Sequence, residues 1–249
     1  MLKVLTWNVA GRTGRLADQV RTVLRQDADI VCLQEVREST RPVWAEALAS
    51  AGLSQVADSS GRSDRRLFNL TASHWPVTEL DRFAVPQPER VVSVRVRTDR
   101  GAIEVHNIHV PPLRGDGAAK IETLVATHEA LAVPSSGHRL LCGDLNTAGR
   151  EFAGSDPEIT GRWAIAEGLL LRGLADWDLH DIYRELHGTR GTEVSCSTPG
   201  HYRKKGSRLD HMLASRSLRP VHCEYQHGWR QEGFSDHSAV EGIFEPEFA

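Results

Sequence analysis

Residues 139–146 read Arg-Leu-Leu-Cys-Gly-Asp-Leu-Asn, an apolar run that ends in the polar sequence Gly143-Asp144-Leu145-Asn146. The apolar run predicts a buried strand, and the polar residues stand where that strand ends. Far downstream, Phe234-Ser235-Asp236-His237 places a carboxylate and an imidazole beside a second apolar segment. Carboxylate, amide and imidazole groups hold hard divalent cations, orient water and protonate leaving oxygens. These distant segments are therefore candidates for one shared site that acts on a phosphate.

The composition is typical of a folded domain. The chain has 249 residues, of which 40% are hydrophobic and 25% charged, and residues 1–249 fit one sheet-rich domain. No apolar run reaches the length of about 18 residues that a membrane span requires, so no membrane partner is expected. The strand-like start at Met1 to Leu5 predicts that no secretory leader is present, and hence a cytoplasmic location. No feature indicates an obligate protein partner.

The net charge of −3 argues against strong binding of nucleic acid through overall charge alone. Local basic groups are present nevertheless, among them Arg203, Lys204 and Lys205. These three side chains are either solvated surface or contacts for phosphates. The four cysteines show no Cys-x-x-Cys spacing, so neither a zinc site nor a disulfide framework is indicated, and Cys32 and Cys142 are expected to pack as reduced apolar residues.

Strand and helix patterns alternate along the chain. Helical spacing of apolar residues predicts helices near residues 16–24, 43–51 and 118–132, the last with Val125 turned inward. The polar stretch 54–66 is predicted to be a loop. Buried strands are expected to include residues 2–8, 29–35, 91–97, 102–109 and 139–142 and segments of the last third of the chain, with 91–97 and 102–109 forming a hairpin.

Polar residues recur where these predicted strands end, namely at Asn8, Glu35, His109 and Asp144. Each has an ordinary structural explanation, such as a turn cap or a half-buried histidine. Asp210 is harder to explain, because it interrupts a strand that should be buried and a buried carboxylate needs a partner. Sites are often built where loops are held by a rigid sheet, which places polar groups accurately.

Together these segments resemble the endonuclease/exonuclease/phosphatase superfamily, the metal-dependent phosphodiesterases that include pancreatic-type deoxyribonucleases and abasic-site endonucleases. The resemblance extends over nearly the whole chain, and the order Gly-Asp-x-Asn followed much later by Ser-Asp-His is its most specific part. The segments that carry it are Thr6-Trp7-Asn8-Val9, Leu33-Gln34-Glu35, Asn107-Ile108-His109-Val110-Pro111, Gly143-Asp144-Leu145-Asn146, Arg208-Leu209-Asp210-His211 and Phe234-Ser235-Asp236-His237.

The resemblance implies an α/β (α+β) fold, a four-layer sandwich in which two mixed sheets pack face to face between helices. It implies a hydrolase that uses Mg²⁺ or Mn²⁺, held by Glu35, Asn8 and Asp236.

The same resemblance implies the roles of the remaining site residues. Asp144 would activate the attacking water, and Asn146 would orient water or phosphate. His237 would contact a phosphate oxygen and be kept cationic by Asp210, while His109 would bind the phosphate or protonate the leaving oxygen. Which histidine does which is left open by the sequence.

The sequence departs from abasic-site endonucleases at Ala10, where they usually carry Asp, and at His109, where they carry Tyr. The loop 195–205 also lacks the Trp or Phe that would pack against an extruded sugar. An abasic-site specialist is therefore disfavoured.

We expect a nuclease that hydrolyses DNA or RNA as an endonuclease or exonuclease, with the basic residues 203–205 contacting nucleic acid. Two alternatives remain: a phosphatase or phosphodiesterase that acts on a small nucleotide or metabolite, and a catalytically silent binding module with the same fold.

Overall fold

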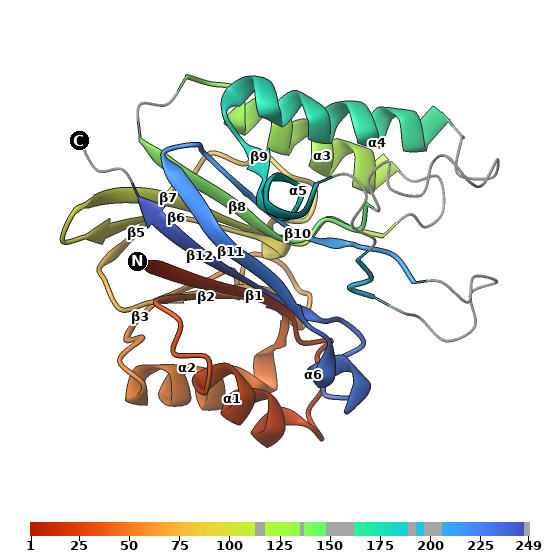
Figure 1. Cartoon of the computed structure of the whole chain (residues 1–249). Helices are drawn as coiled ribbons and strands as arrows, with labels where there is room; N and C mark the ends of the chain where they lie inside the picture. The colour runs from red at the N-terminus through yellow and green to blue at the C-terminus, as the bar shows by residue number, and fades with distance from the viewer. Residues whose placement is uncertain (113–117, 135–136, 148–161, 189–192, 197–205, 247–249) are drawn as a thin grey trace.

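The computed structural model describes residues 1–112, 118–134, 137–147, 162–188, 193–196 and 206–246, and side chains within this part except those of 162–165. Two six-stranded sheets lie face to face in the described chain, with helices on the outer side of each (Figure 1). Both sheets mix parallel and antiparallel pairs. The predicted sandwich of two mixed sheets between helices is thus confirmed.

The first sheet contains both ends of the described chain. Its central pair, β1 and β2, is parallel, and its other neighbouring strands are antiparallel. In spatial order its strands are β11 (Leu218–Gln226), β12 (Ala239–Pro246), β1 (Leu2–Asn8), β2 (Ile30–Arg37), β4 (Leu67–Ser73) and β3 (Gln55–Asp58).

The second sheet contains the predicted hairpin, which is formed by β6 and β7. Strands β7 and β8 are parallel, as are β1 and β2 in the first sheet. In spatial order the strands are β5 (Val77–Glu79), β6 (Val91–Thr98), β7 (Gly101–Ile108), β8 (His138–Asp144), β10 (Asp210–Ala214) and β9 (His180–Asp181).

Helices α1 and α2 cover one outer face of the sandwich, and α3 and α4 cover the other (Figure 1). The helices are α1 (Leu16–Leu24), α2 (Arg41–Ser50), α3 (Ala118–Leu131), α4 (Arg162–Gly173), α5 (Ile182–His187) and α6 (His227–Gln231), with short 3₁₀ turns at Glu38–Thr40, Pro88–Arg90 and Leu174–Trp177. In the described ranges, no helix has both the length and the apolar character that crossing a bilayer requires.

Two sequence predictions are corrected by the structure. Part of the stretch 54–66 forms strand β3 rather than loop, because it pairs with β4 at the edge of the first sheet. Val125 of α3 is exposed, whereas Lys120 is buried. Burial of Lys120 is possible because its ammonium pairs with Glu167 of α4 at 2.7 Å, a contact between elements that helical periodicity cannot reveal.

The core between the sheets is apolar and includes Cys32 and Cys142, which are free and buried as predicted. Near one edge of the sandwich the core becomes polar. The amide of Asn107 on β7 donates to the backbone carbonyls of Leu33 and Leu70 and accepts from Gln34 Nε2 at 2.8 Å. Because buried amides need partners, this network fixes the two sheets relative to each other directly below the polar edge.

Strand direction explains why polar residues gather at that edge. Asn8 ends β1 beside Gln34 of the parallel strand β2, and Asn107 near the end of β7 lies beside Cys142 of the parallel strand β8. Asp210 begins β10 opposite Asp144 in an antiparallel pair, so it lies at the same end. The sheets therefore deliver polar side chains from distant segments to one edge of the sandwich.

Candidate active site

Glu35 reaches the edge through an irregularity in β2. The pairing of β2 with β4 shifts between Leu33 and Val36, and Glu35 has a φ of 55°. This is a β-bulge with a residue in the left-handed region, which re-aims a side chain at some cost in backbone strain. The strand continues to Arg37, so the expectation that Glu35 ends a strand is wrong, and the bulge brings its carboxylate to the site instead.

Asn8 bridges two carboxylates. Its Nδ2 donates to Glu35 Oε1 at 3.3 Å and to Asp144 Oδ2 at 3.0 Å, while its Oδ1 accepts from the backbone N–H of Ala10 at 2.9 Å. The backbone carbonyl of Asn8 also accepts from Ser235 Oγ at 2.6 Å, which ties β1 to the segment that precedes His237. In this arrangement Asn8 acts as a donor that holds Glu35 and Asp144 close together.

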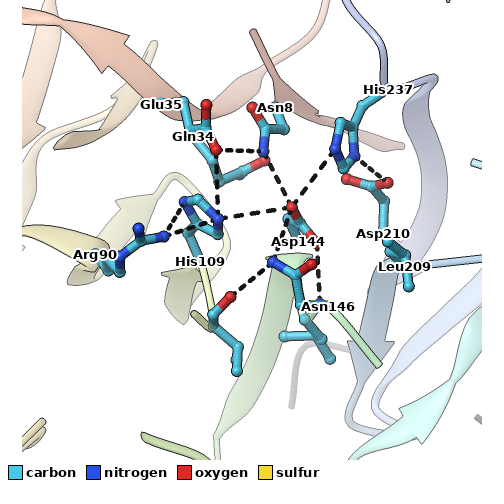
Figure 2. Close-up of polar contacts among 12 residues, drawn as sticks. Asn8, Gln34, Glu35, Arg90, His109, Asp144, Asn146, Leu209, Asp210 and His237 are labelled. Carbon is cyan, nitrogen blue, oxygen red and sulfur yellow. Dashed lines mark hydrogen bonds and ion pairs between the residues drawn. The ribbon is translucent and has the colours of Figure 1, made fainter. Parts of the chain in front are cut away.

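Asp144 lies at the centre of the cluster (Figure 2). The turn that follows it is built by Asn146, whose backbone N–H donates to Asp144 Oδ1 at 2.9 Å and whose Nδ2 donates to the carbonyl of Val110 at 2.8 Å. The preceding glycine is required by close approach, since a Cβ on Gly143 would lie 2.1 Å from the carbonyl oxygen of Ile108. Local sequence therefore fixes both the position and the orientation of the Asp144 carboxylate.

His237 and Asp210 form a buried pair. Nδ1 of His237 lies 2.8 Å from Asp210 Oδ2, and its Nε2 points toward Asp144 Oδ2 at 3.8 Å. The backbone holds the ring in place, because the carbonyl of His237 accepts from Trp7 Nε1 at 2.9 Å and its N–H donates to Ser235 Oγ. One imidazole thus lies between two carboxylates from different strands.

Charge states follow from this geometry. Burial alone would lower the pKa of His237, but the carboxylates of Asp210 and Asp144 outweigh it and hold that pKa well above its ordinary value. Burial raises the pKa of Asp144 to about 7, although His237 opposes the rise. The cluster therefore combines an imidazolium with a carboxylate that titrates near neutrality.

His109 occupies a different environment on the other side of Asp144. Its Nε2 lies 3.5 Å from Glu35 Oε1 and 3.7 Å from Asp144 Oδ2. Nη1 of Arg90 lies 2.8 Å from each of its ring nitrogens (Figure 2). Burial first, and then the charges of Arg90 and His237, lower the pKa of His109 well below its ordinary value. His109 is therefore a neutral imidazole at neutral pH.

Arg90 was not identified from the sequence. It lies at the end of a 3₁₀ turn and directly before the buried strand β6, so its position resembles that of the polar residues at other strand ends. That placement was a usable signal, but a single arginine before a strand is common at protein surfaces.

Asp236 lies beside the cluster in sequence but has different contacts. Its Oδ1 lies 4.0 Å from Arg12 Nη2, and its side chain is 39% exposed. Within the described residues, this Oδ1 atom is shielded from solvent and accepts no hydrogen bond, and Asp210 Oδ1 is in the same state. The predicted substrate-contacting residues Arg203, Lys204 and Lys205 lie outside the described residues.

The residues present fit a divalent cation. Glu35 and Asp144 are held close together by one neutral amide, and each lies within 4 Å of the same nitrogen of His109, so their charges are only partly compensated. Asp144 and Asp210 belong, with His237, to a group whose potential ligand atoms lie within 4.8 Å of one another, and His237 would ligate only after losing its proton. Hard oxygen donors with unsatisfied charge are what Mg²⁺ and Mn²⁺ select.

Comparisons with known proteins identify the family of the chain. The sequence profile of the Endonuclease/Exonuclease/phosphatase family matches residues 5–237, which contain every site residue described above. The chain belongs to this family and is a phosphoester hydrolase by class. A comparison with curated proteins finds no significant match.

Solved structures with the same fold include nucleases and a phosphatase. An AP endonuclease from Archaeoglobus fulgidus superposes with a TM-score of 0.80 at 20% identity, over 98% of this chain and 100% of that one. A 3′ phosphatase from Neisseria bound to a product DNA hairpin gives 0.76 at 24% identity, and a 3′-5′ exonuclease from Neisseria meningitidis gives 0.75 at 24%, both with the same coverage. At these identities the likeness shows the fold.

Proposed function

We propose that this protein is a Mg²⁺- or Mn²⁺-dependent phosphodiesterase, and specifically a nuclease that hydrolyses DNA or RNA. The observation that carries the proposal is the convergence of Asn8, His109, Asn146 and His237 on the carboxylate of Asp144. A central base between an imidazolium and a neutral imidazole is suited to water attack on a phosphodiester. Two structural relatives, an AP endonuclease and a 3′-5′ exonuclease, support a nucleic acid as the substrate.

The cation would be held by Glu35, with Asp236 and Asn8 as further ligands. Glu35 offers a carboxylate on a strained bulge, and Asp236 offers a shielded oxygen that accepts no hydrogen bond in the described chain. Asn8 turns its Nδ2 toward the carboxylates, so ligation through its Oδ1 requires rotation of the amide. When bound, the cation withdraws charge from a phosphate oxygen and stabilises the charge of the transition state.

The side chains supply the proton transfers. Asp144 accepts the proton of the attacking water, and Asn146 orients the water or the phosphate. His237 carries donors on both ring nitrogens, one of them engaged by Asp210 at 2.8 Å, so its Nε2–H is directed at the developing negative charge. His109 is neutral beside Arg90, which makes it a hydrogen-bond partner of the phosphate rather than the main proton donor.

Arg90 and the basic segment Arg203-Lys204-Lys205 would bind the polyanionic substrate. Arg90 is half-buried next to the centre of the cluster, where a guanidinium can contact a phosphate oxygen. Neutralising residues 203–205 should weaken cleavage of nucleic acid more than cleavage of a small phosphodiester, because only the polymer offers flanking phosphates. Equal effects on both substrates would exclude this role for the segment.

The first experiment is nicking of supercoiled plasmid by the pure protein in Mg²⁺, with and without chelator. Asp144→Asn should lower the rate by at least about 10²-fold, the scale for loss of a general base. Glu46→Gln removes an exposed carboxylate on α2 and serves as the matched control. A loss of less than threefold in Asp144→Asn would contradict the assigned role.

The second candidate is a small-molecule phosphatase or phosphodiesterase that uses the same residues. The net charge of −3 favours it mildly, and a 3′ phosphatase is among the structural relatives. Metal-dependent hydrolysis of bis(p-nitrophenyl) phosphate or a nucleotide, without cleavage of DNA or RNA, would establish this candidate. A folded protein with no turnover on any phosphoester would instead indicate a silent binding module.

A further inference from the structure

A cavity of about 500 Å³ lies beside strand β6, next to the proposed active site but separate from its carboxylates. Its apolar lining includes Phe83, Val85 and Val91, and its polar lining includes Arg62, Glu79 and Asp81. The volume lies within the range of about 300–1,000 Å³ that is typical of small-ligand sites. None of the roles proposed above involves these six residues.

The cavity and the proposed active site share a short piece of backbone. Val91 lines the cavity, and the preceding residue, Arg90, contacts the ring of His109. The backbone N–H of His109 also donates to the carbonyl of Arg90 at 2.9 Å, and Arg62 Nη1 donates to the carbonyl of Val91 at 3.0 Å. The backbone that lines the cavity therefore continues directly into Arg90, which contacts His109 of the proposed active site.

The aromatic wall of the cavity is supported from below. The ring of Phe83 lies 5.3 Å from the ring of His106, which is fully buried and contacts Ser93 Oγ through its Nδ1 at 2.8 Å. Phe83 also packs on the apolar cluster beneath α3, to which Val91 belongs. Because these side chains are already held in place, a ligand would bind without a large cost for ordering the wall.

The charges at the cavity select against a phosphate. Arg62 is engaged by Glu79 Oε2 at 2.5 Å and by the Val91 carbonyl, so its cation is compensated. Asp81 adds a second carboxylate to the lining and leaves it net negative. Such a rim accepts hydrogen bonds from N–H groups and repels anions.

We propose that this cavity is a subsite for a nucleobase of the substrate next to the cleaved phosphate, and that it favours guanine. Phe83 provides a face for stacking, which nucleobases share. Guanine presents N1–H and an amino group side by side, and a carboxylate of the rim, which accepts hydrogen bonds through two oxygens, would pair with both. This inference rests on the proposed nuclease function, although base binding itself is measurable without turnover.

The binding test uses nucleotides and nuclear magnetic resonance. Guanosine 5′-monophosphate and uridine 5′-monophosphate are titrated separately into the Asp144→Asn protein, in which turnover is suppressed. Because both ligands carry the same phosphate and sugar, differences between them report the base. We expect larger shifts at Phe83 and Val91 with the guanine nucleotide, lost in Phe83→Ala. Equal shifts with both nucleotides, or none at these residues, overturn the inference whether or not the protein is a nuclease.

The kinetic test uses oligonucleotides that differ at one nucleotide position beside the cleaved bond. This position carries guanine, thymine or an abasic spacer. For the wild type, replacing guanine by the spacer on one side of the bond should raise KM about tenfold with little change in kcat. Phe83→Ala should abolish this difference in KM between guanine and the spacer. Asp81→Asn should abolish the preference for guanine over thymine. Leu169→Ala changes an exposed position of α4 and should keep both the KM difference between guanine and the spacer and the preference for guanine over thymine.

The outcomes separate the two proposals. Cleavage that is indifferent to the base on either side in the wild type overturns the subsite and leaves the nuclease intact. Absence of cleavage of any oligonucleotide by a folded protein overturns the nuclease, and the titration then decides the base site alone.

Discussion

Lys120 offers a direct test of how the scaffold controls the site. Its side chain is 4% exposed, its Nζ lies 2.7 Å from Glu167 Oε2, and it donates to the backbone carbonyl of Asn146 at 2.7 Å. Asn146 has a φ of 47°, a left-handed conformation that asparagine tolerates better than most residues with a side chain. Lys120 is therefore a positioning residue that ties the Asn146 turn to α3.

The expected magnitudes follow from burial. Lys120→Met leaves the carboxylate of Glu167 buried without its partner, which costs about 3–5 kcal/mol of unfolding free energy. It also removes a charged hydrogen bond to the Asn146 carbonyl, a contact worth about 1.5–3 kcal/mol. In the double variant Lys120→Met/Glu167→Met no charge remains buried, so most of the stability should return, because apolar replacement of a buried pair is often neutral.

Stability and activity should therefore separate. We expect urea unfolding to show a large decrease in the free energy of unfolding for the single variant and a small decrease for the double variant. We expect kcat/KM for a phosphodiester to fall about tenfold in both, since a barrier change of about 1.4 kcal/mol is enough. Lys120→Arg keeps a donor and is the control for charge. If the double variant regains wild-type kcat/KM together with its stability, the positioning role is refuted, because the single variant then lost activity only through lost stability.

Three further predictions concern titration, metal and backbone. Burial lowers the pKa of His106 in the folded state to about 3. Between about pH 6.5 and 3 the His106 imidazole is therefore protonated in the unfolded chain only, so the free energy of unfolding decreases as the pH falls through that window. At pH 5 this contribution of His106 lowers the free energy of unfolding by about 2 kcal/mol. Urea unfolding of His106→Gln at several pH values should not show this decrease. Mg²⁺ should raise the melting temperature of the wild type and much less that of Glu35→Gln; equal shifts would place the cation elsewhere. Gly143→Ala should destabilise by more than about 3 kcal/mol in the same unfolding assay, because its Cβ would meet the carbonyl oxygen of Ile108 at 2.1 Å.

Much of the fold could be predicted because strand patterns and strand ends are local signals. The apolar run before Gly143-Asp144 and the alternation in 91–97 and 102–109 identified strands that the structure contains. The short edge strands β3 and β5 escaped prediction for a physical reason. Each is three or four residues long and pairs on one side only, so its residues are largely solvated and carry little periodicity.

Residue types at the site could also be anticipated, whereas their orientation could not. Glu35 is at the site because a bulge turns it there, and a bulge depends on the register between β2 and β4. Lys120 was overlooked because a buried lysine is rare unless paired, and its partner Glu167 lies on another helix.

The electrostatic roles depend even more on three-dimensional neighbours. The sequence does not fix the charge of either histidine, since His109 stands between Ile108 and Val110 and His237 between Asp236 and Ser238. In the structure Arg90 contacts both ring nitrogens of His109, whereas Asp210 contacts Nδ1 of His237. Burial, and then the charge of Arg90, lower the pKa of His109, whereas the carboxylates of Asp210 and Asp144 outweigh burial and raise the pKa of His237. The cluster thus holds one neutral and one charged imidazole on opposite sides of Asp144, and the proposed mechanism therefore takes the proton for the leaving oxygen from the His237 side.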